Sequence, residues 1–182
     1  CKKIKSIAIK NGAEVPFYRP KKYCTDKATD FEVFSHALNW LYKNQGYKPE
    51  LIVHLRPTSP LRSVEDLDKM IKLLIKNPSV DSARSVSLSI RTPYKMWKID
   101  KNGFLKSIIS NYNKKEFYNQ PRQTLPTSYD HNANIDIIRA NTILKKKSMS
   151  GKKILPFVQK KIIVDIDEYK DLIFTRKLMK KY

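Results

Sequence analysis

The sequence contains few cysteines and few glycines, and it has no long apolar run. Cys1 and Cys24 are its only cysteines among 182 residues, and neither stands in a Cys-x-x-Cys or His-paired spacing. This argues against a disulfide framework and a structural zinc site, and it suits a reducing cytoplasm. No apolar stretch approaches the roughly 18 residues of a transmembrane helix, and the N-terminus lacks the apolar core of a signal peptide. We therefore expect a cytoplasmic protein without a membrane span.

Acidic residues are also scarce: 17 Asp and Glu stand against 37 Lys and Arg, which gives a formal net charge of +20. Such an excess is compatible with a nucleic-acid partner. The lysines are scattered, however, the tight runs such as 145–147 are short, and no nucleic-acid recognition motif accompanies them. We expect solvated surface lysines and no nucleic-acid partner; a non-catalytic basic binding module remains the alternative from a different functional class.

Helical and extended patterns alternate along the chain, which predicts a single α/β domain. Apolar spacing and capping signals predict helices over 1–10, from Asp30 as N-cap to Gly46, from Ser63 to Asn77, and over 168–181 with Leu172, Ile173 and Met179 toward the core. Short apolar runs predict strands at 51–55, 81–88, 135–138 and 162–164. Residues 94–130 form a long irregular excursion, which is usually a functional flap or a subunit contact.

The most informative local feature is the sequence Leu-Arg-Pro-Thr-Ser-Pro-Leu-Arg at residues 55–62, at the end of a predicted strand. Its two prolines fix φ and remove N–H donors, so the loop is stiff. Arg56 and Arg62 each offer a planar fork of donors to phosphate or carboxylate, and Thr58 and Ser59 add hydroxyls. A polyanion site at the carboxyl edge of an α/β sheet and an ordinary strand-to-helix connection are equally compatible with this loop alone.

A second candidate feature is the pair Asp165 and Asp167, which follows a predicted strand. Side chains two apart on a strand point to the same face, so both carboxylates would converge and would need a compensating cation. Mg²⁺ is the natural candidate, because it accepts one or two protein carboxylates and completes its shell with water and substrate phosphates. The alternative is equally open: Asp167 caps the next helix and Asp165 pairs with a lysine.

A third group of polar side chains suits an oxygen-rich ligand such as a sugar acid. It consists of residues 120–123, which include Arg122 and Gln123, together with Asn132 and Asn134. By itself this pattern is weak, because polar loops are more common than sugar sites. The histidines at positions 36, 54 and 131 show no metal-ligand spacing, and we predict structural roles for them.

Taken in order, these segments resemble the acylneuraminate cytidylyltransferases, also called CMP-sialic acid synthetases. The matching segments are 12–17 with Arg19 and Pro20, 56–62, 81–82 with 85–86, 121–126, Asn132, and 165–167. They span nearly the whole chain in the order of the family, which is more specific than any single motif.

The resemblance implies a three-layer α/β/α nucleotide-sugar transferase sandwich with a mixed, mostly parallel sheet, usually a homodimer. It implies an enzyme that joins CTP to a nine-carbon acidic sugar with the help of Mg²⁺, releases pyrophosphate and forms a CMP-sugar for cell-surface glycans. By position, Arg122 matches an active-site arginine and is the candidate catalytic residue. The remaining candidates are Arg19, Arg56, Thr58, Ser59, Gln123 and Asn132 for the substrates, and Asp165 and Asp167 for the metal. Residues 94–130 would include part of a dimer-forming and sugar-covering excursion.

The chain departs from the family pattern in two ways. The Gly- and Lys-rich loop that wraps the nucleotide phosphates has no counterpart among the four glycines. We therefore expect an N-terminally truncated member of the family whose 182 residues alone bind CTP poorly or not at all, and an inactive remnant is a further alternative. Arg56 also replaces the family glutamine, and residues 132–136 read Asn-Ala-Asn-Ile-Asp where many relatives have Asn-Gly-Ala-Ile-Tyr. This second departure predicts a branch acting on a different acidic sugar, such as a bacterial nonulosonic acid.

Overall fold

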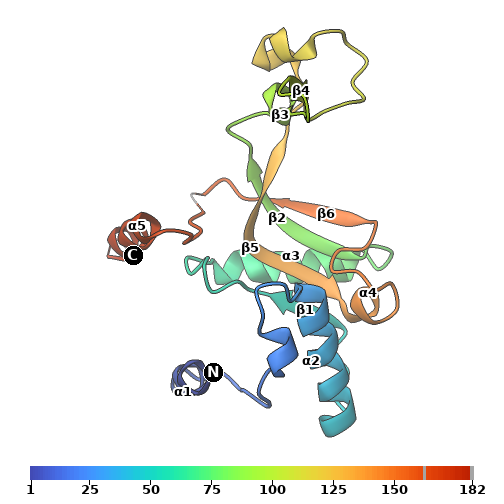
Figure 1. Ribbon diagram of the computed structural model, residues 1–182. Coiled ribbons are helices and arrows are strands. Elements are labelled where there is room, and N and C mark those ends of the chain that lie inside the picture. Colours follow the sequence, from blue (N-terminus) through green and yellow to red (C-terminus); the bar gives the residue numbers. More distant parts are fainter. Residues whose placement is uncertain (162, 181–182) are drawn as a thin grey trace. The chain divides into compact units, whose positions relative to one another are not determined.

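A four-stranded sheet forms the framework of the fold: Asn132 lies in its strand β5, and residues 56–62 follow its strand β1 (Figure 1). Its strands lie in the order β1-β5-β2-β6, and their bounds are β1 Leu51–His54, β2 Ser82–Leu88, β5 Tyr129–Arg139 and β6 Ile154–Val158. β2 and β6 are parallel, with Ser82 opposite Ile154 and Val86 opposite Val158. β2 and β5 are antiparallel. The Ile135 N–H donates to the Ser85 hydroxyl, and four residues further on the Ser89 N–H donates to the carbonyl of Ser128, so the partner number falls as the β2 number rises. The sheet is therefore mixed.

The structure describes residues 1–161 and 163–180, which form two compact units. The N-terminal unit comprises Cys1–Ile52 and Ile138–Gly151, and the central unit comprises Val53–Ile137 and Lys152–Tyr182. Each unit has its own buried apolar residues. Leu38, Ile138 and Ile143 form the core of the N-terminal unit, whereas Met70, Leu74, Ala83, Ile135 and Ile137 are fully buried in the central unit.

Helix α2 (Asp30–Gln45) supplies the main apolar face of the N-terminal unit. Thr29, not the predicted Asp30, is its N-cap: the Thr29 hydroxyl accepts from the Glu32 N–H, and the Glu32 carboxylate accepts from the Thr29 N–H. Thr29 fits because it is the residue whose backbone is still extended while its side chain reaches the first turn. Gly46 ends the helix at a φ of 64°, a left-handed conformation that favours glycine. Helix α1 (Lys2–Lys10) precedes it.

Helix α3 (Val64–Lys76) begins as predicted, because the Ser63 hydroxyl accepts a hydrogen bond from the Asp66 N–H. Met70 and Leu74, four residues apart on one face, have no exposed surface, and α3 lies against β2 in the central unit (Figure 1). This packing fixes the start of α3, and with it the loop 56–62 that leads into the helix.

The excursion at 94–130 joins the end of β2 to β5 and is largely irregular, as predicted. It contains an antiparallel hairpin of β3 (Trp97–Ile99) and β4 (Leu105–Ser107) and three short 3₁₀ helices, η2 Pro93–Lys95, η3 Phe117–Asn119 and η4 Arg122–Thr124. Another 3₁₀ helix, η1 (Lys21–Tyr23), lies near the N-terminus. Tyr94, Tyr112 and Phe117 stack edge to face, with ring centroids 5.0 to 6.0 Å apart, and hold the excursion together.

Two expectations at the C-terminal end are wrong, and two elements were missed. The predicted strand at 162–164 is absent from its described part, Ile163 and Val164, and Ile162 lies outside the described residues. The final helix, α5 (Tyr169–Met179), does not bury its apolar side chains as expected, since Ile173 is 41% and Met179 56% exposed. The structure also contains β6 and the short helix α4 (Ala140–Leu144), neither of which was predicted.

Candidate active site

Residues 56–62 form a tight turn that we call the arginine turn. The Ser59 N–H bonds the Arg56 carbonyl at 3.2 Å. The Arg62 guanidinium donates from Nη2 to the same carbonyl, and from Nε to the carbonyl of Asn134 on β5 at 2.9 Å. One side chain thus closes the turn and ties it to the sheet. The stiffness expected from the two prolines is reinforced by these bonds.

Arg62 lies in an electropositive and partly desolvated environment. Burial, and then the positive charge of Arg56, lower the pKa of Arg62 from its ordinary value, while Asp165 acts in the opposite direction. A guanidinium remains charged at neutral pH despite such a shift. The arginine turn therefore offers fixed positive charge next to a carboxylate.

The acidic segment 165–167 lies against the arginine turn. The Ile166 N–H bonds the Thr58 carbonyl at 2.8 Å, and the Ser59 hydroxyl donates to Asp165 Oδ1 at 3.3 Å. Ser59 is fully buried, whereas Asp167 is exposed. The segment is not part of a strand, so the expectation that both carboxylates point to one face of a strand does not apply. One main-chain bond, not a sheet register, brings Asp165 to the turn.

Asn132 organises a polar network at a bend in β5. Its Oδ1 accepts from the Ser85 hydroxyl at 2.6 Å and from the Asn134 N–H at 3.2 Å, and its Nδ2 donates to the Ser87 hydroxyl at 2.9 Å. Ala133, between the two asparagines, has a φ of 55°, the left-handed region. This bend lets residues 132 and 134 bond each other locally, as asparagine side chains do in turns.

Gln159, just after β6, links this network to α3. Its Nε2 donates to Asp66 Oδ2 at 2.9 Å and to Asn134 Oδ1 at 3.4 Å, and its Oε1 accepts from Asn132 at 3.1 Å. The Asn134 Nδ2 is buried without a hydrogen-bond partner among the residues that the structure describes. Sequence reasoning did not select Gln159 or Asp66 as site residues. Gln159 stands in no motif, Asp66 was interpreted as part of the capping box that begins at Ser63, and the contact between them is long-range.

Asp136, two residues further along β5, is another buried group that sequence reasoning did not select as a site residue. Its carboxylate contacts Arg56 and His131, each at 3.0 Å, and Arg84 at 3.6 Å. The residue is 2% exposed. His131, for which a structural role was predicted, therefore lies among charged residues of the candidate site.

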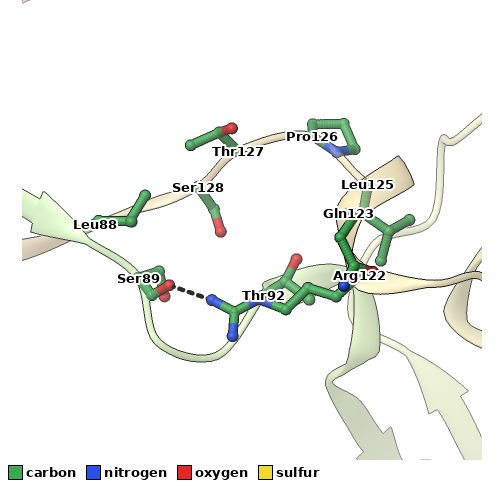
Figure 2. Close-up of a pocket in the computed structure, with 9 residues that line it drawn as sticks. All are labelled: Leu88, Ser89, Thr92, Arg122, Gln123, Leu125, Pro126, Thr127 and Ser128. Atoms are coloured by element: carbon green, nitrogen blue, oxygen red, sulfur yellow. Dashed lines mark hydrogen bonds between the residues drawn. The ribbon is translucent and has the colours of Figure 1, made fainter.

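Arg122 and Gln123 line a separate cavity of about 410 Å³ in the central unit (Figure 2). The Arg122 guanidinium reaches across it and donates from Nη2 to the Ser89 carbonyl at 2.9 Å, as Figure 2 shows. Ser89 in turn donates its hydroxyl to Asp130 on β5 at 2.9 Å. The arginine turn does not line this cavity.

Arg19 belongs to the N-terminal unit, so it is described apart from the other candidate residues. It is exposed and lines a cavity of about 570 Å³ together with Glu14, Cys24 and His36. The rings of His36 and Phe17 pack edge to face at 5.3 Å, in keeping with the structural role predicted for this histidine.

The donor set at Asp165 and Asp167 suits Mg²⁺. No group of three or more His, Cys, Asp or Glu side chains that could hold a metal forms among the described residues, so a closed all-protein cage is absent there. Mg²⁺ commonly binds through one or two carboxylates and takes its other ligands from water and phosphate. A partly exposed Asp165 and an exposed Asp167 fit that mode.

No family model matches the chain, but solved structures and curated proteins resemble it. A synthetase of CMP-2-keto-3-deoxy-manno-octonic acid, solved with CTP, superposes with a TM-score of 0.65 at 12% identity, over 100% of this chain and 78% of that one. A 4-diphosphocytidyl-2C-methyl-D-erythritol synthase from Anaerococcus prevotii gives 0.60 at 16% identity, over 98% and 76%. The chain therefore shares the fold of these two proteins, and the predicted α/β class is confirmed.

Two curated relatives resemble the chain in sequence over nearly its whole length. Post-translational flagellin modification protein B of Campylobacter coli is 28% identical over 98% of this chain and 73% of its own length. CMP-N,N'-diacetyllegionaminic acid synthase of Legionella pneumophila is 28% identical over 98% of this chain and 74% of its own. The resemblance to acylneuraminate cytidylyltransferases predicted from the sequence is confirmed.

Proposed function

We propose that this protein transfers the cytidylyl group of CTP to a nonulosonic acid, a nine-carbon acidic sugar, and releases pyrophosphate. The observation that carries the proposal is the contact between the arginine turn and the acidic segment, through Thr58–Ile166 and Ser59–Asp165. It places positive charge, which suits a triphosphate and an acidic sugar, beside a carboxylate that would bind Mg²⁺. The names of the relatives supply the cytidylyl group and the sugar class.

In this reaction the anomeric hydroxyl oxygen of the sugar forms a bond to the α-phosphorus of CTP. The bond from that phosphorus to the bridging oxygen breaks, pyrophosphate leaves with the bonding electrons, and the hydroxyl loses its proton. Little covalent chemistry falls to the protein, so positioning and fixed positive charge provide most of the rate. Arg56 and Arg122 are the arginines to which we assign this role, with Arg19, Thr58, Ser59, Gln123 and Asn132 as further substrate contacts.

Asp165 and Asp167 are the residues that would hold Mg²⁺. When bound there, the ion would neutralise phosphate charge. Ser59 supports this assignment, because its buried hydroxyl donates to Asp165 and so fixes the carboxylate in one orientation.

The experiment that tests the proposal is a coupled pyrophosphate-release screen on the complete gene product that contains these residues. CTP and Mg²⁺ are supplied with N,N'-diacetyllegionaminate, N-acetylneuraminate and 2-keto-3-deoxy-manno-octonate. We expect turnover with a nonulosonic acid other than N-acetylneuraminate, because Arg56 and Asp136 replace the family glutamine and tyrosine. A clear preference for N-acetylneuraminate would contradict that sugar assignment, and no turnover with any acid would contradict the proposed activity.

We propose further that the protein is a homodimer in which the excursion 94–130 forms the contact. Support comes from its exposed apolar side chains, among them Ile99, Phe104 and Leu105 on the β3–β4 hairpin, since a contiguous exposed apolar surface usually marks an interface. Sedimentation velocity of the gene product and of the variant Phe104→Ser with Leu105→Ser tests this: the wild type should sediment as a dimer and the variant as a monomer.

We place the product, a CMP-sugar, in the synthesis of cell-surface glycans, in keeping with the flagellin modification named for one relative, and the enzyme in the cytoplasm. Among the described residues, no helix combines the length and apolar character needed to cross a bilayer. The nucleic-acid-binding alternative is not favoured, because the relatives are synthases and synthetases.

A further inference from the structure

Asp136 is a buried carboxylate surrounded by three basic side chains of the central unit. Its Oδ2 accepts from Arg56 Nη1 at 3.0 Å, while its Oδ1 lies 3.0 Å from His131 Nε2 and 3.6 Å from Arg84 Nε. The Asp136 side chain is 3% exposed, against 24% for Arg56 and 30% for Arg84. Among these side chains, the Asp136 carboxylate faces two guanidiniums, so Arg56, Arg84 and Asp136 together carry one net positive charge.

Stability alone is a poor explanation for this arrangement. Desolvating a carboxylate and its partners costs about as much as their attraction returns, so a buried ion pair is weak evidence for a stabilising role. Arg56 is fixed a second time, since its Nη1 also approaches the Ala133 carbonyl at 3.4 Å. A guanidinium held by a carboxylate and a carbonyl has lost rotamer freedom before any ligand arrives, which is a form of preorganisation.

The two members of this pair are also the positions at which the sequence departs from the acylneuraminate pattern. By the resemblance given above, Arg56 stands where the family has glutamine and Asp136 where many of its members have tyrosine. The two residues are 80 positions apart in the chain, yet they contact each other directly. The two departures therefore form one structural change: an ion pair replaces two uncharged side chains.

We propose that Asp136 is the positioning residue for Arg56, and that the Arg56–Asp136 pair acts as a unit that determines which acidic sugar the site accepts. This inference rests on the proposed function. The bound group is an anion, the carboxylate of the sugar, because the cluster of Arg56, Arg84 and Asp136 carries a net positive charge and guanidinium forks suit carboxylates. Arg56 contacts the sugar, and Asp136 acts through Arg56.

The test is a double-mutant cycle on the complete gene product with Asp136→Asn, Arg56→Gln and the double variant. Isothermal titration measures binding of N,N'-diacetyllegionaminate and of N-acetylneuraminate, and pyrophosphate release gives KM for sugar and for CTP. Each single variant should weaken binding of the first sugar by about 10- to 100-fold, the range for a hydrogen bond to a charged group. The double variant should bind no more weakly than the weaker single variant, because both changes remove the same unit.

Arg139→Gln is the matched control, since it breaks the Arg139–Glu50 pair, whose N–O distance is also 3.0 Å. It should leave both affinities unchanged, and KM for CTP should stay unchanged in all variants. Arg56→Gln should also shift the ratio of the two sugar affinities toward N-acetylneuraminate. Losses that multiply in the double variant, or that affect CTP as much as sugar, overturn the inference.

Arg56→Lys provides a second route should Asp136→Asn not fold, because it keeps the charge but lacks the planar fork. It should bind the first sugar at least about 10-fold more weakly; wild-type affinity in this variant overturns the inference. A wild type that turns over sugar while the Asp136 variant is unaffected leaves the proposed function standing and the inference wrong. If sugar binding depends on Asp136 but no pyrophosphate is released, the inference about Asp136 stands and the proposed function is wrong. A wild type that binds neither acid overturns both the inference and the proposed function.

Discussion

Replacing Ala133 with glycine should stabilise the protein, although this exchange usually destabilises. Ala133 lies in β5 with a φ of 55°. For a residue with a Cβ this conformation costs roughly 1–2 kcal/mol, because the Cβ approaches the following carbonyl oxygen. Glycine removes that cost. It also gives the unfolded chain more conformational freedom, which lowers the free energy of unfolding by about 0.5–1 kcal/mol. The difference predicts a gain of up to about 1.5 kcal/mol for Ala133→Gly, with a central value of about 0.75 kcal/mol.

Ala83→Gly is the control within the same unit. Ala83 lies in β2 and is fully buried. The same entropy cost applies to it, no strain is relieved, and about 0.8 kcal/mol is lost with the buried methyl group. Together these terms predict a loss of about 1–2 kcal/mol, opposite in sign to the change at Ala133.

Urea unfolding followed by circular dichroism gives the free energies, and hydrogen exchange at the amides of Ile135 and Ile137 reports on β5 itself. We expect slower exchange in Ala133→Gly and faster exchange in Ala83→Gly. Destabilisation of similar size in both variants would refute the strain at Ala133. The bend that joins Asn132 to Asn134 would then be an unstrained feature of β5.

Three further outcomes are expected. Asp165→Asn and Asp167→Asn should each abolish Mg²⁺-dependent pyrophosphate release in the complete gene product while circular dichroism stays unchanged; full activity in both would remove the metal assignment. Thr29→Ala should lower the stability of the N-terminal unit by about 1 kcal/mol, because the capping bond to the Glu32 N–H is lost, and Thr25→Ala, outside the helix, should not in the same urea titration. Hydrogen bonds from the Phe104 N–H, and then from Lys106, lower the pKa of Asp100. The Asp100 carboxylate therefore stabilises the β3–β4 hairpin fully above the ordinary Asp pKa of about 3.9, and this stabilisation is lost as pH falls through the lower pKa of the folded state. An NMR titration of the Phe104 amide should follow this loss in the wild type and not in Asp100→Asn.

The elements that were predicted correctly carry their signal in local sequence. Helix α3 has a serine cap at Ser63 and apolar residues such as Leu67, Ile71 and Leu74 at helical spacing. The near-continuous apolar run of β1 marks a strand in the same way. These patterns depend on neighbours within four residues, so they were readable without coordinates.

The missed strand β6 illustrates where local signals mislead. Its sequence contains Pro156, and proline within an apolar run argues against a strand, because it cannot donate to the ladder. Among the strands that the structure describes, β6 is the last in the sheet order, and its sheet partner is β2. An edge strand tolerates proline, since one row of its backbone groups has no ladder partner. Only the sheet order, which is a long-range property, makes Pro156 acceptable.

The acidic segment shows the same limit in the candidate site. A strand was predicted there, and the convergence of the two carboxylates was argued from the alternation of side chains along it. In the structure a bond from the Ile166 N–H to the Thr58 carbonyl holds the segment, and Asp165 contacts Ser59 from irregular backbone. The proximity of acidic segment and arginine turn therefore does not require a strand. It requires a free main-chain carbonyl on the turn, and Pro57 and Pro60 favour one, because they remove N–H donors and leave the carbonyls of a fixed backbone available to other segments.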